Sequence, residues 1–585
     1  MKKMETVLRA DAVRVTDHKG RIVENFHVRK RESAQGTYRL CLDYRGGQPF
    51  HLGEICLYSG PHGFPAQSQF YGEGYQMLSQ TDGTLERSHD VGEMTDRGHY
   101  KLPQVPKKTT VHSLLRLDAP SGEGLLLGFS SCHRFPAEFR FDTQNLDIVL
   151  KGDGIRVDPL DTLETEELFW MEGDRQETFE TFAQAILHHH PRLEWATRPT
   201  GWCSWYCYGP KVTETDIINN AQAVAELDVD LDYVQIDDGY QAAMGDWLSP
   251  HPNFPRPIKE LCDSIRQEGK QPAIWVAPFI AEKKSKIFQE HPDWFVRDEW
   301  GAPLLSSTIS FGGWRRGPWY MLDGTHPQVR AHLQRIFLHM RQEWGVQYFK
   351  LDANLWGCLG GTYSDEKATR VQAYRAGMQA IVEAVGGDSF LLGCNAPMWP
   401  SLGLVHGMRT TGDVLRWPQT IKRLKKEGLY RNWQHKTLWL NDPDCAVLDN
   451  LPFNRVSLAA GGFSVFFPLK ENLFTYHVTY LGATGGMLLS GDCLDRLSDR
   501  AKSWLSMLAQ LPDVAAKFQG SDFSVGMTEH EGKRWHFFMN DSSSSRLYTL
   551  PIQAKSLLLP KGSVHQGETI QIPSMSGAIF YEVMK

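Results

Sequence analysis

The stretch Gln347-Tyr348-Phe349-Lys350-Leu351-Asp352-Ala353-Asn354 predicts a short buried strand with two charged side chains at its carboxyl end. Side chains two positions apart on a strand point to the same face, so Lys350 and Asp352 emerge side by side. Charged groups are costly to bury unless they are paired or face a site. The stretch alone therefore fits a buried structural ion pair as well as a functional site.

Seven other short apolar segments repeat this strand pattern, and helical sequences lie between most of them. With 348–352, the expected strands are residues 199–205, 233–237, 273–278, 390–394, 405–409, 437–441 and 487–490. Eight buried strands that alternate with helices over about 300 residues are typical of a (β/α)8 TIM barrel. The gap from Trp275 to Lys350 predicts a long loop region, whereas the gap from Cys394 to Arg409 leaves little room for a helix.

Both flanks of the expected barrel show β-patterning. Residues 1 to about 185 alternate strand-like segments with turns rich in Gly, Asp and Asn, and the helical sequence ETFETFAQAILHHH follows. Alternating strand-like segments return after about residue 510. We therefore predict an α/β fold with three domains. These are an antiparallel β-sandwich with its linking helix at 1–190, the catalytic barrel at 191–510 and a small antiparallel β-domain at 511–585.

Composition limits the partners of this 585-residue chain. Its net charge of -7, without a basic tract, argues against nucleic acid and anionic membranes as partners. No secretory signal or long apolar segment is visible, and the 10 cysteines show neither a disulfide framework nor zinc-ligand spacing. We therefore predict a cytoplasmic protein with reduced thiols and no bound metal. The oligomeric state is not determined by the sequence.

In such a barrel, side chains at the carboxyl ends of the strands form the active site. Here these ends supply carboxylates, a lysine, an arginine and several tryptophans, whose flat faces suit stacking on a sugar ring. The candidates are Trp202, Asp237, Asp238, Trp275, Lys350, Asp352, Cys394, Arg409 and Asp413. Turns, helix caps and barrel closure would explain single members of this set, but not their convergence on one rim. Paired carboxylates beside aromatic side chains are typical of glycoside hydrolysis.

A series of motifs in order resembles glycoside hydrolase family 36, the melibiases, and especially its compact bacterial α-galactosidases. The motifs are GWCSWY, QIDDGY with GDW, IWVAPF, HPDWF, YFKLD, GC-x-x-P, GMR-x-x-x-D and WLNDPDC. The resemblance covers about residues 198 to 450, and it implies a β-sandwich, a (β/α)8 barrel and a C-terminal β-domain. It also implies retaining hydrolysis of terminal α-linked galactose, without a metal or cofactor.

The resemblance also implies roles for individual residues. Asp352 in YFKLD matches the family nucleophile, and Asp413 matches its acid/base. The sugar-binding positions are matched by Asp237, Asp238, Trp275, Lys350, Arg409 and Cys394, the last at the sugar's 2-position, with Trp202 as a further candidate. Two departures concern substrate choice. Tyr75 stands where an N-terminal loop of the family commonly offers a tryptophan, and Asn395 follows Cys394 where a glycine is usual.

We therefore predict an exo-acting α-galactosidase whose two catalytic carboxylates lie about 5–5.5 Å apart, the separation for retention. Asp352 attacks the anomeric carbon, and Asp413 protonates the departing oxygen and later activates water. An α-N-acetylgalactosaminidase and a raffinose-synthase-like α-galactosyltransferase are alternatives on the same scaffold. A non-catalytic carbohydrate-binding protein is a third, and the presence of both aspartates argues against it. We expect galactose to be preferred, because Cys394 offers an acetamido group no strong hydrogen-bond donor.

Overall fold

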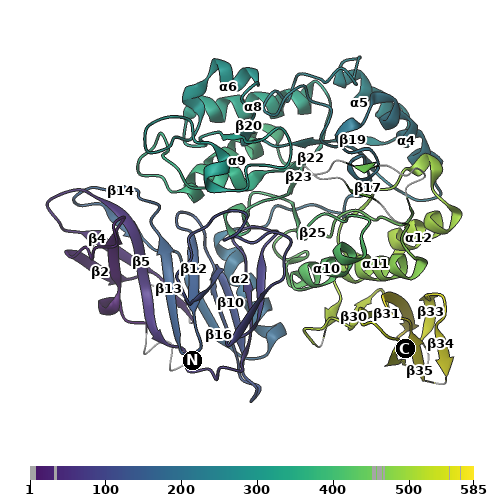
Figure 1. The fold of residues 1–585 in the computed structure, drawn as a ribbon, viewed down its shortest axis with the longest axis horizontal. Coiled ribbons are helices and arrows are strands. Elements are labelled where there is room, and N and C mark those ends of the chain that lie inside the picture. Colours follow the sequence, from purple (N-terminus) through teal and green to yellow (C-terminus); the bar gives the residue numbers. More distant parts are fainter. Residues whose placement is uncertain are drawn as a thin grey trace.

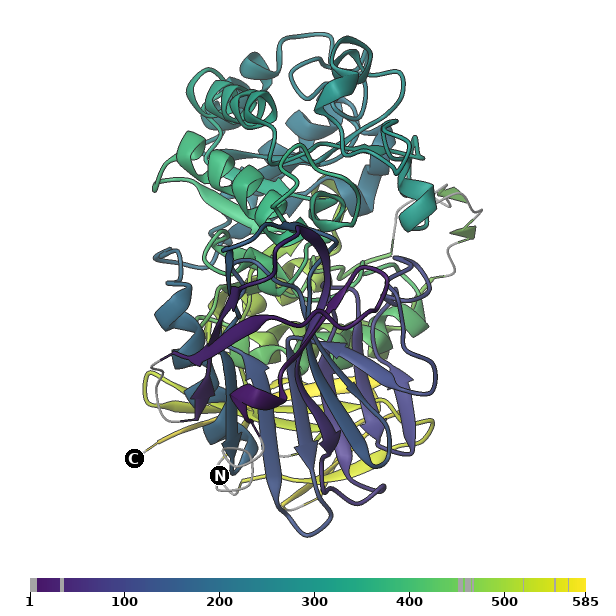
Figure 2. The same ribbon diagram turned by 90° about the vertical axis from the view of Figure 1, so that its left-hand side faces the viewer.

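The computed structural model describes residues 8–31, 36–450, 456–457, 464–465, 468–518, 520–551, 554–566 and 568–584. The chain runs from an N-terminal β-domain (purple and blue) through a barrel (teal and green) to a C-terminal β-domain (yellow; Figure 1). Turned by 90°, the N-terminal strands stand in front of the C-terminal ones, and both sets lie below the barrel (Figure 2).

The barrel is an eight-stranded sheet in which every neighbouring pair is parallel. In chain order its strands are β17 (Thr200–Cys203), β18 (Tyr233–Ile236), β19 (Gln271–Val276), β22 (Tyr348–Leu351), β23 (Phe390–Gly393), β24 (Gly407–Arg409), β25 (Leu440–Asp442) and β28 (Leu488–Ser490). The sheet order runs from β25 back to β17 and then to β28, and a bridge between Ala446 and Ser490 brings its two edges together. Strands covered by helices are apolar on both faces, so these segments were visible in the sequence. The predicted (β/α)8 barrel is confirmed.

Helices follow most of the strands. They are α3 (Trp205–Tyr208), α4 (Glu214–Glu226), α5 (Ile258–Gln267), α8 (Pro327–Gln342), α9 (Arg370–Val385), α10 (Pro418–Leu429), α11 (Glu471–Thr484) and α12 (Asp499–Gln510). The long segment between β19 and β22 also holds α6 (Lys286–Glu290), α7 (Ser306–Ile309), β20 (Ile280–Ala281) and β21 (Tyr320–Met321). Between β23 and β24 the chain makes only a 3-10 turn at Trp399–Ser401, because too few residues are present for a helix. The two-residue strands β26 (Val456–Ser457) and β27 (Ser464–Val465) pair with each other.

The N-terminal domain consists of antiparallel sheets around a core of its own. One sheet contains β1 (Arg14–Asp17), β5 (Phe50–Pro61), β9 (Thr109–His112), β12 (Ala137–Phe141), β13 (Asn145–Lys151) and β14 (Arg156–Val157). A second contains β3 (Thr37–Tyr38), β6 (Gln69–Glu73), β7 (Gln80–Thr84), β8 (Arg87–Asp90), β10 (Leu114–Asp118), β11 (Gly124–Phe129) and β16 (Leu168–Glu172). A small third sheet contains β2 (Phe26–Lys30), β4 (Leu40–Tyr44) and β15 (Thr162–Glu164). Helix α2 (Arg175–His189) then leads to the barrel.

The C-terminal domain is also antiparallel and has a small core around Phe538 and Ile570. Its larger sheet contains β29 (Lys517–Phe518), β30 (Val525–His530), β31 (Lys533–Asn540), β33 (Lys555–Leu558) and β36 (Ser576–Val583). Its smaller sheet contains β32 (Arg546–Thr549), β34 (Val564–Gln566) and β35 (Thr569–Ile572). The domain packs on α11, where the backbone N–H of Gly577 donates to Thr475.

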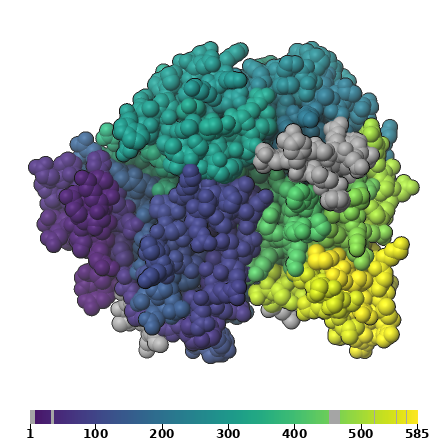
Figure 3. All heavy atoms as spheres, in the orientation of Figure 1, coloured from purple at the N-terminus to yellow at the C-terminus, as the bar shows by residue number. Residues whose placement is uncertain are grey.

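The N-terminal domain is joined to the barrel by backbone pairing. The N–H of Met77 donates to the carbonyl of Ala396 at 3.0 Å, and the N–H of Met398 donates to that of Tyr75 at the same distance. The two parts form one continuous surface on the face shown in Figure 3. A segment of the N-terminal domain therefore lies against the turn that follows β23, at the carboxyl end of the barrel.

The prediction of ten reduced thiols is wrong for two of them. Cys207 on α3 and Cys493 after β28 form a disulfide, and the other eight cysteines are free. β17 and β28 are neighbours in the sheet, so the segments that follow them meet even though 286 residues separate the two cysteines. Within the described part of the chain, no helix is long and apolar enough to cross a membrane.

Candidate active site

Asp352 follows β22 directly, and both of its carboxylate oxygens are held. Oδ2 accepts from the indole N–H of Trp275 on β19 at 2.9 Å, and Oδ1 accepts from the backbone N–H of Ala353 at 2.7 Å. Ala353 has a left-handed φ of 51°, so the chain turns sharply at this point. Burial raises the pKa of Asp352, while the charge of Lys350 and the Trp275 hydrogen bond lower it. The carboxylate thus has one orientation, with donors that favour its charged form.

Lys350 contacts Asp237, which follows β18. Its Nζ lies 2.9 Å from Asp237 Oδ2, and both side chains are buried. The same oxygen accepts from Gln235 at 2.6 Å and from the thiol of Cys203 at 3.4 Å. Burial lowers the pKa of Lys350, but Asp237, Cys203, Cys394 and Asp352 together more than compensate, so this pKa lies above its ordinary value. Both predicted site residues therefore belong to one charged network.

Asp238 is held by a residue that the sequence prediction missed. Its Oδ2 accepts from Nε of Arg315 at 2.9 Å, and its Oδ1 accepts from a second Arg315 nitrogen and from Gln241. Arg315 comes from the long segment between β19 and β22. Trp314 beside it packs on Trp356, with ring centroids 5.8 Å apart. The only signal in the sequence was the aromatic and basic stretch FGGWRRGPWY, whose loop position depends on tertiary structure.

Arg409, the last residue of β24, joins Asp413 to two further residues. Its Nη2 lies 2.9 Å from Asp413 Oδ1, 2.6 Å from Asp444 Oδ2 and 3.1 Å from the Tyr206 hydroxyl, which donates to Asp444. Burial raises the pKa of Asp444, Arg409 lowers it and Asp413 raises it. The side chain of Asp413 is 47% exposed, whereas that of Arg409 is 2% exposed. Asp413 is thus open to solvent above a buried guanidinium.

Cys394 and Asn395 follow β23, between these two carboxylate groups. Cys394 is buried, and burial together with the charge of Asp352 raises the pKa of its thiol, while Arg409 lowers it. Asn395 has a φ of 41°, and its Oδ1 accepts from the hydroxyl of Tyr100 in the N-terminal domain at 3.0 Å. The carbonyl of the Asn395 amide is therefore already engaged by the protein.

Trp202 and Tyr75 have partners within the protein framework. Trp202 on β17 is fully buried. Its indole N–H donates to the carbonyl of Asp492 at 2.7 Å, so the ring packs against the segment after β28. Tyr75 is also buried, and its hydroxyl donates to the carbonyl of Cys358 at 3.1 Å. These contacts place both rings in packing, and their suggested contact with substrate stays a prediction.

The remaining candidates meet at the carboxyl ends of five consecutive strands, β18, β19, β22, β23 and β24. They comprise three carboxylates held by hydrogen bonds, one half-exposed carboxylate and several further polar or aromatic side chains. The set is Asp237, Asp238, Trp275, Lys350, Asp352, Cys394, Arg409 and Asp413. This barrel and this set of side chains are typical of glycoside hydrolases.

Comparisons with known proteins agree with this class. Residues 173–386 match the family model described as Melibiase. The α-galactosidase of Escherichia coli is 28% identical over 126 residues, which are 20% of this chain and 16% of that protein. The chain thus matches about a sixth of the length of this relative.

Two solved structures share the fold over almost the whole chain. TtGalA, an α-galactosidase from Thermus thermophilus in complex with p-nitrophenyl α-D-galactopyranoside, gives a TM-score of 0.63 at 22% identity and covers 87% of this chain and 96% of its own. The family 36 α-galactosidase AgaA from Geobacillus stearothermophilus gives 0.60 at 14% identity, with 98% of this chain and 89% of its own covered. The chain therefore resembles the melibiases over residues 173–386 and shares the fold of solved α-galactosidases.

Proposed function

We propose that the protein is a retaining exo-α-galactosidase that hydrolyses terminal α-linked galactose from small oligosaccharides. The observation that carries the proposal is the carboxylate of Asp352, which is held by Trp275 and Ala353 near the charge of Lys350. A carboxylate with fixed orientation and nearby positive charge is suited to nucleophilic attack. Asp413, exposed and hydrogen-bonded to Arg409, is suited to exchanging protons with a departing group and with water.

The reaction proceeds by two displacements. Asp352 attacks the anomeric carbon, the glycosidic bond breaks, and the proton of Asp413 passes to the departing oxygen. Asp413 then takes a proton from a water molecule, whose oxygen displaces Asp352 and leaves galactose in its original α-configuration. Each step inverts the anomeric carbon, so the configuration is retained after two steps.

Small α-galactosides are the expected substrates. The T. thermophilus structures of similar fold hold p-nitrophenyl α-D-galactopyranoside and stachyose. In this chain Asp237, Asp238 and Lys350 supply acceptors and donors of the kind that sugar hydroxyls need. Trp275 adds an aromatic ring beside the nucleophile.

The proposal is tested with p-nitrophenyl α-galactoside, alone and with sucrose or galactinol as acceptor. Free galactose as the main product, first released as the α-anomer in NMR spectra, is expected. Transfer of galactose to the acceptor would favour the galactosyltransferase alternative instead. Binding without release or transfer would identify a carbohydrate-binding protein, and β-galactose as the first product would exclude retention.

The cytoplasm is the location that we propose from the sequence. A cytoplasmic protein is expected to keep its cysteines reduced, whereas Cys207 and Cys493 form a disulfide in the structure. Counting free thiols in denatured protein from native cells tests the location. Ten thiols fit the cytoplasm, and eight fit an oxidising compartment.

A further inference from the structure

The N-terminal domain contributes a carboxylate to the surroundings of Asp413. Glu93 lies between β8 and β9, and its side chain is 25% exposed. Its Oε2 accepts from the backbone N–H of Asp413 at 3.3 Å and pairs with Nη2 of Arg423 on α10 at 2.9 Å. A residue 320 positions before Asp413 therefore holds the main chain that carries this candidate acid.

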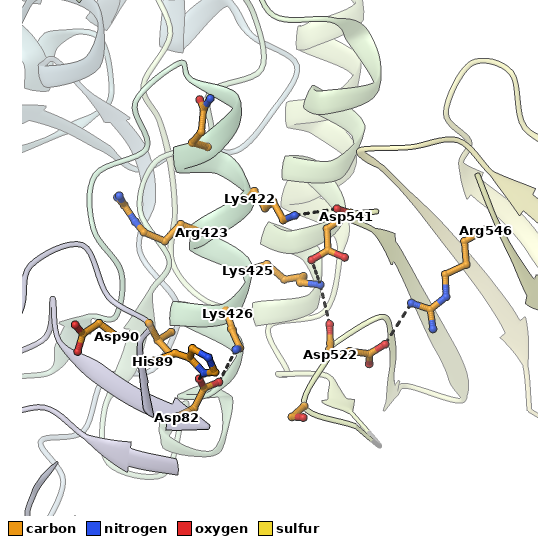
Figure 4. A pocket seen from close by; sticks show the side chains of 13 residues that line it. Asp82, His89, Asp90, Lys422, Arg423, Lys425, Lys426, Asp522, Asp541 and Arg546 are labelled. Carbon is orange, nitrogen blue, oxygen red and sulfur yellow. Dashed lines mark hydrogen bonds and ion pairs between the residues drawn. The ribbon is translucent and has the colours of Figure 1, made fainter. Parts of the chain in front are cut away.

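A second carboxylate holds the preceding residue. Glu427 on α10 accepts from the backbone N–H of Gly412 at 2.8 Å, and its other oxygen lies 2.9 Å from Nε of Arg423. Arg423 thus pairs with both Glu93 and Glu427. These two carboxylates accept from the backbone N–H groups of Asp413 and Gly412, respectively. In Figure 4, Arg423 projects from α10 away from the C-terminal domain, beside a cavity of about 630 Å³ between the domains.

Glu93 and Arg423 occupy the space beside Gly412 that a side chain would take. A Cβ atom at Gly412 would lie 2.1 Å from Oε2 of Glu93 and 2.9 Å from Nη2 of Arg423. Any other residue would therefore force the carboxylate and the guanidinium to move. Because position 412 has no side chain, Glu93 of the N-terminal domain and Arg423 of the barrel both lie close to the segment that ends in Asp413.

Charges of both signs face Asp413. Arg409 on β24 is the positive group, Glu93 and Asp444 are carboxylates from two other segments, and Tyr206 on α3 contacts the same guanidinium. Burial raises the pKa of Glu93 itself to about 7, with Arg423 opposing and Asp413 adding to this rise.

We propose that Glu93 is a positioning residue for Asp413: it fixes the main chain that carries the general acid. The proposal rests on the proposed function. It assigns the N-terminal β-domain a part in the reaction, because Glu93 belongs to that domain and holds Asp413 across the interface.

Leaving-group dependence separates this role from a structural one. A dinitrophenyl group departs without a proton, whereas the alkoxide of methyl α-galactoside needs one from the general acid. For Glu93→Ala we expect kcat/KM to fall about 10- to 100-fold on methyl α-galactoside, a share of the usual general-acid contribution. On dinitrophenyl α-galactoside the loss should stay below about 3-fold, since no proton transfer is needed there.

Glu93→Gln keeps an acceptor for the Asp413 N–H and removes only the charge. We expect near-normal kcat/KM on both substrates, because the main chain at Asp413 keeps its acceptor. Glu54→Gln is the matched control, because Glu54 is a similarly exposed carboxylate of the same domain that pairs with Arg140 on β12. It should leave kcat/KM on both substrates unchanged.

Equal losses on the two substrates in Glu93→Ala, or a loss in Glu93→Gln as large as that in Glu93→Ala, would overturn the role of Glu93 while the wild-type hydrolysis stands. If the wild-type protein hydrolyses neither galactoside, the proposed function fails and this role with it. Should Glu93→Ala fail to fold, as judged by thermal unfolding, Glu93→Asp replaces it. Its shorter side chain withdraws the acceptor from the Asp413 N–H and keeps the charge, so it should show the same leaving-group dependence, and equal losses on the two substrates would overturn the role.

Discussion

Lys350 forms its 2.9 Å ion pair with Asp237, two strands away in the sheet, although Asp352 is the carboxylate nearest to it in the chain. The long side chain of Lys350 reaches past β19, where Trp275 donates to Asp352. Asp352 therefore accepts its hydrogen bonds from the neutral N–H groups of Trp275 and Ala353. The positive charge that stabilises its ionised form is that of Lys350, which is already paired with Asp237. This arrangement leaves the carboxylate free to attack without first breaking a salt bridge.

Removal of the lysine charge should change the pH profile. In Lys350→Met the charge that lowers the pKa of Asp352 is lost, so this pKa rises further above its ordinary range. The nucleophile must be ionised, and the acid limb of kcat/KM should therefore move to higher pH. Lys425→Met is a control, because Lys425 is a similarly buried lysine on α10 that pairs with Asp541. An acid limb that stays in place in Lys350→Met would contradict the electrostatic role.

Azide should distinguish the two carboxylates. Asp352→Ala should lower kcat by about 10⁴-fold, and azide should restore turnover with β-galactosyl azide as product, because only one displacement remains. In Asp413→Ala the nucleophile is intact, so azide should attack the galactosyl-enzyme and give the α-anomer. NMR spectra of the products decide. The same anomer from both variants would contradict the assignment, and so would a carboxylate separation near about 8 Å, which belongs to inversion.

Galactose should be preferred to N-acetylgalactosamine. Cys394 is a weak donor, and the Asn395 amide that could serve an acetamido group is held by Tyr100. We expect kcat/KM for p-nitrophenyl α-galactoside to exceed that for the acetamido analogue by at least about 10-fold, the cost of an unpaired polar group. Tyr100→Phe frees the amide and should narrow this ratio. Equal values in the wild-type protein, or a preference for the acetamido sugar, would be inconsistent with this assignment.

The interface between the N-terminal domain and the barrel should depend on one buried ion pair. Glu73 on β6 and Arg431 after α10 are both fully buried and contact each other. Arg431→Met leaves the Glu73 charge buried without its partner, which costs about 3–5 kcal/mol. Arg546→Met breaks an exposed pair with Asp522 and should cost less than about 1 kcal/mol. Thermal unfolding of both variants tests this, and similar melting temperatures would refute it.

The eight barrel strands and most of the site were predictable from the sequence. Strands that are buried on both faces are continuous apolar segments, so β22 and its neighbours can be located without knowledge of their partners. Parallel strands in a barrel end at one rim, which is why charged residues such as Asp237, Asp352 and Arg409 could be assigned to one site.

Only the tertiary structure decided which groups support these residues. Arg315, Tyr206 and Asp444 lie in loops or turns, and Glu93 belongs to another domain, so no local pattern links them to Asp238, Arg409 or Asp413. The disulfide of Cys207 and Cys493 was hidden for the same reason. Tyr75 could be recognised as part of a loop, but its direction depends on how two domains pack. The period of a strand sets which face a side chain takes, whereas contacts between distant segments form only when the whole chain closes.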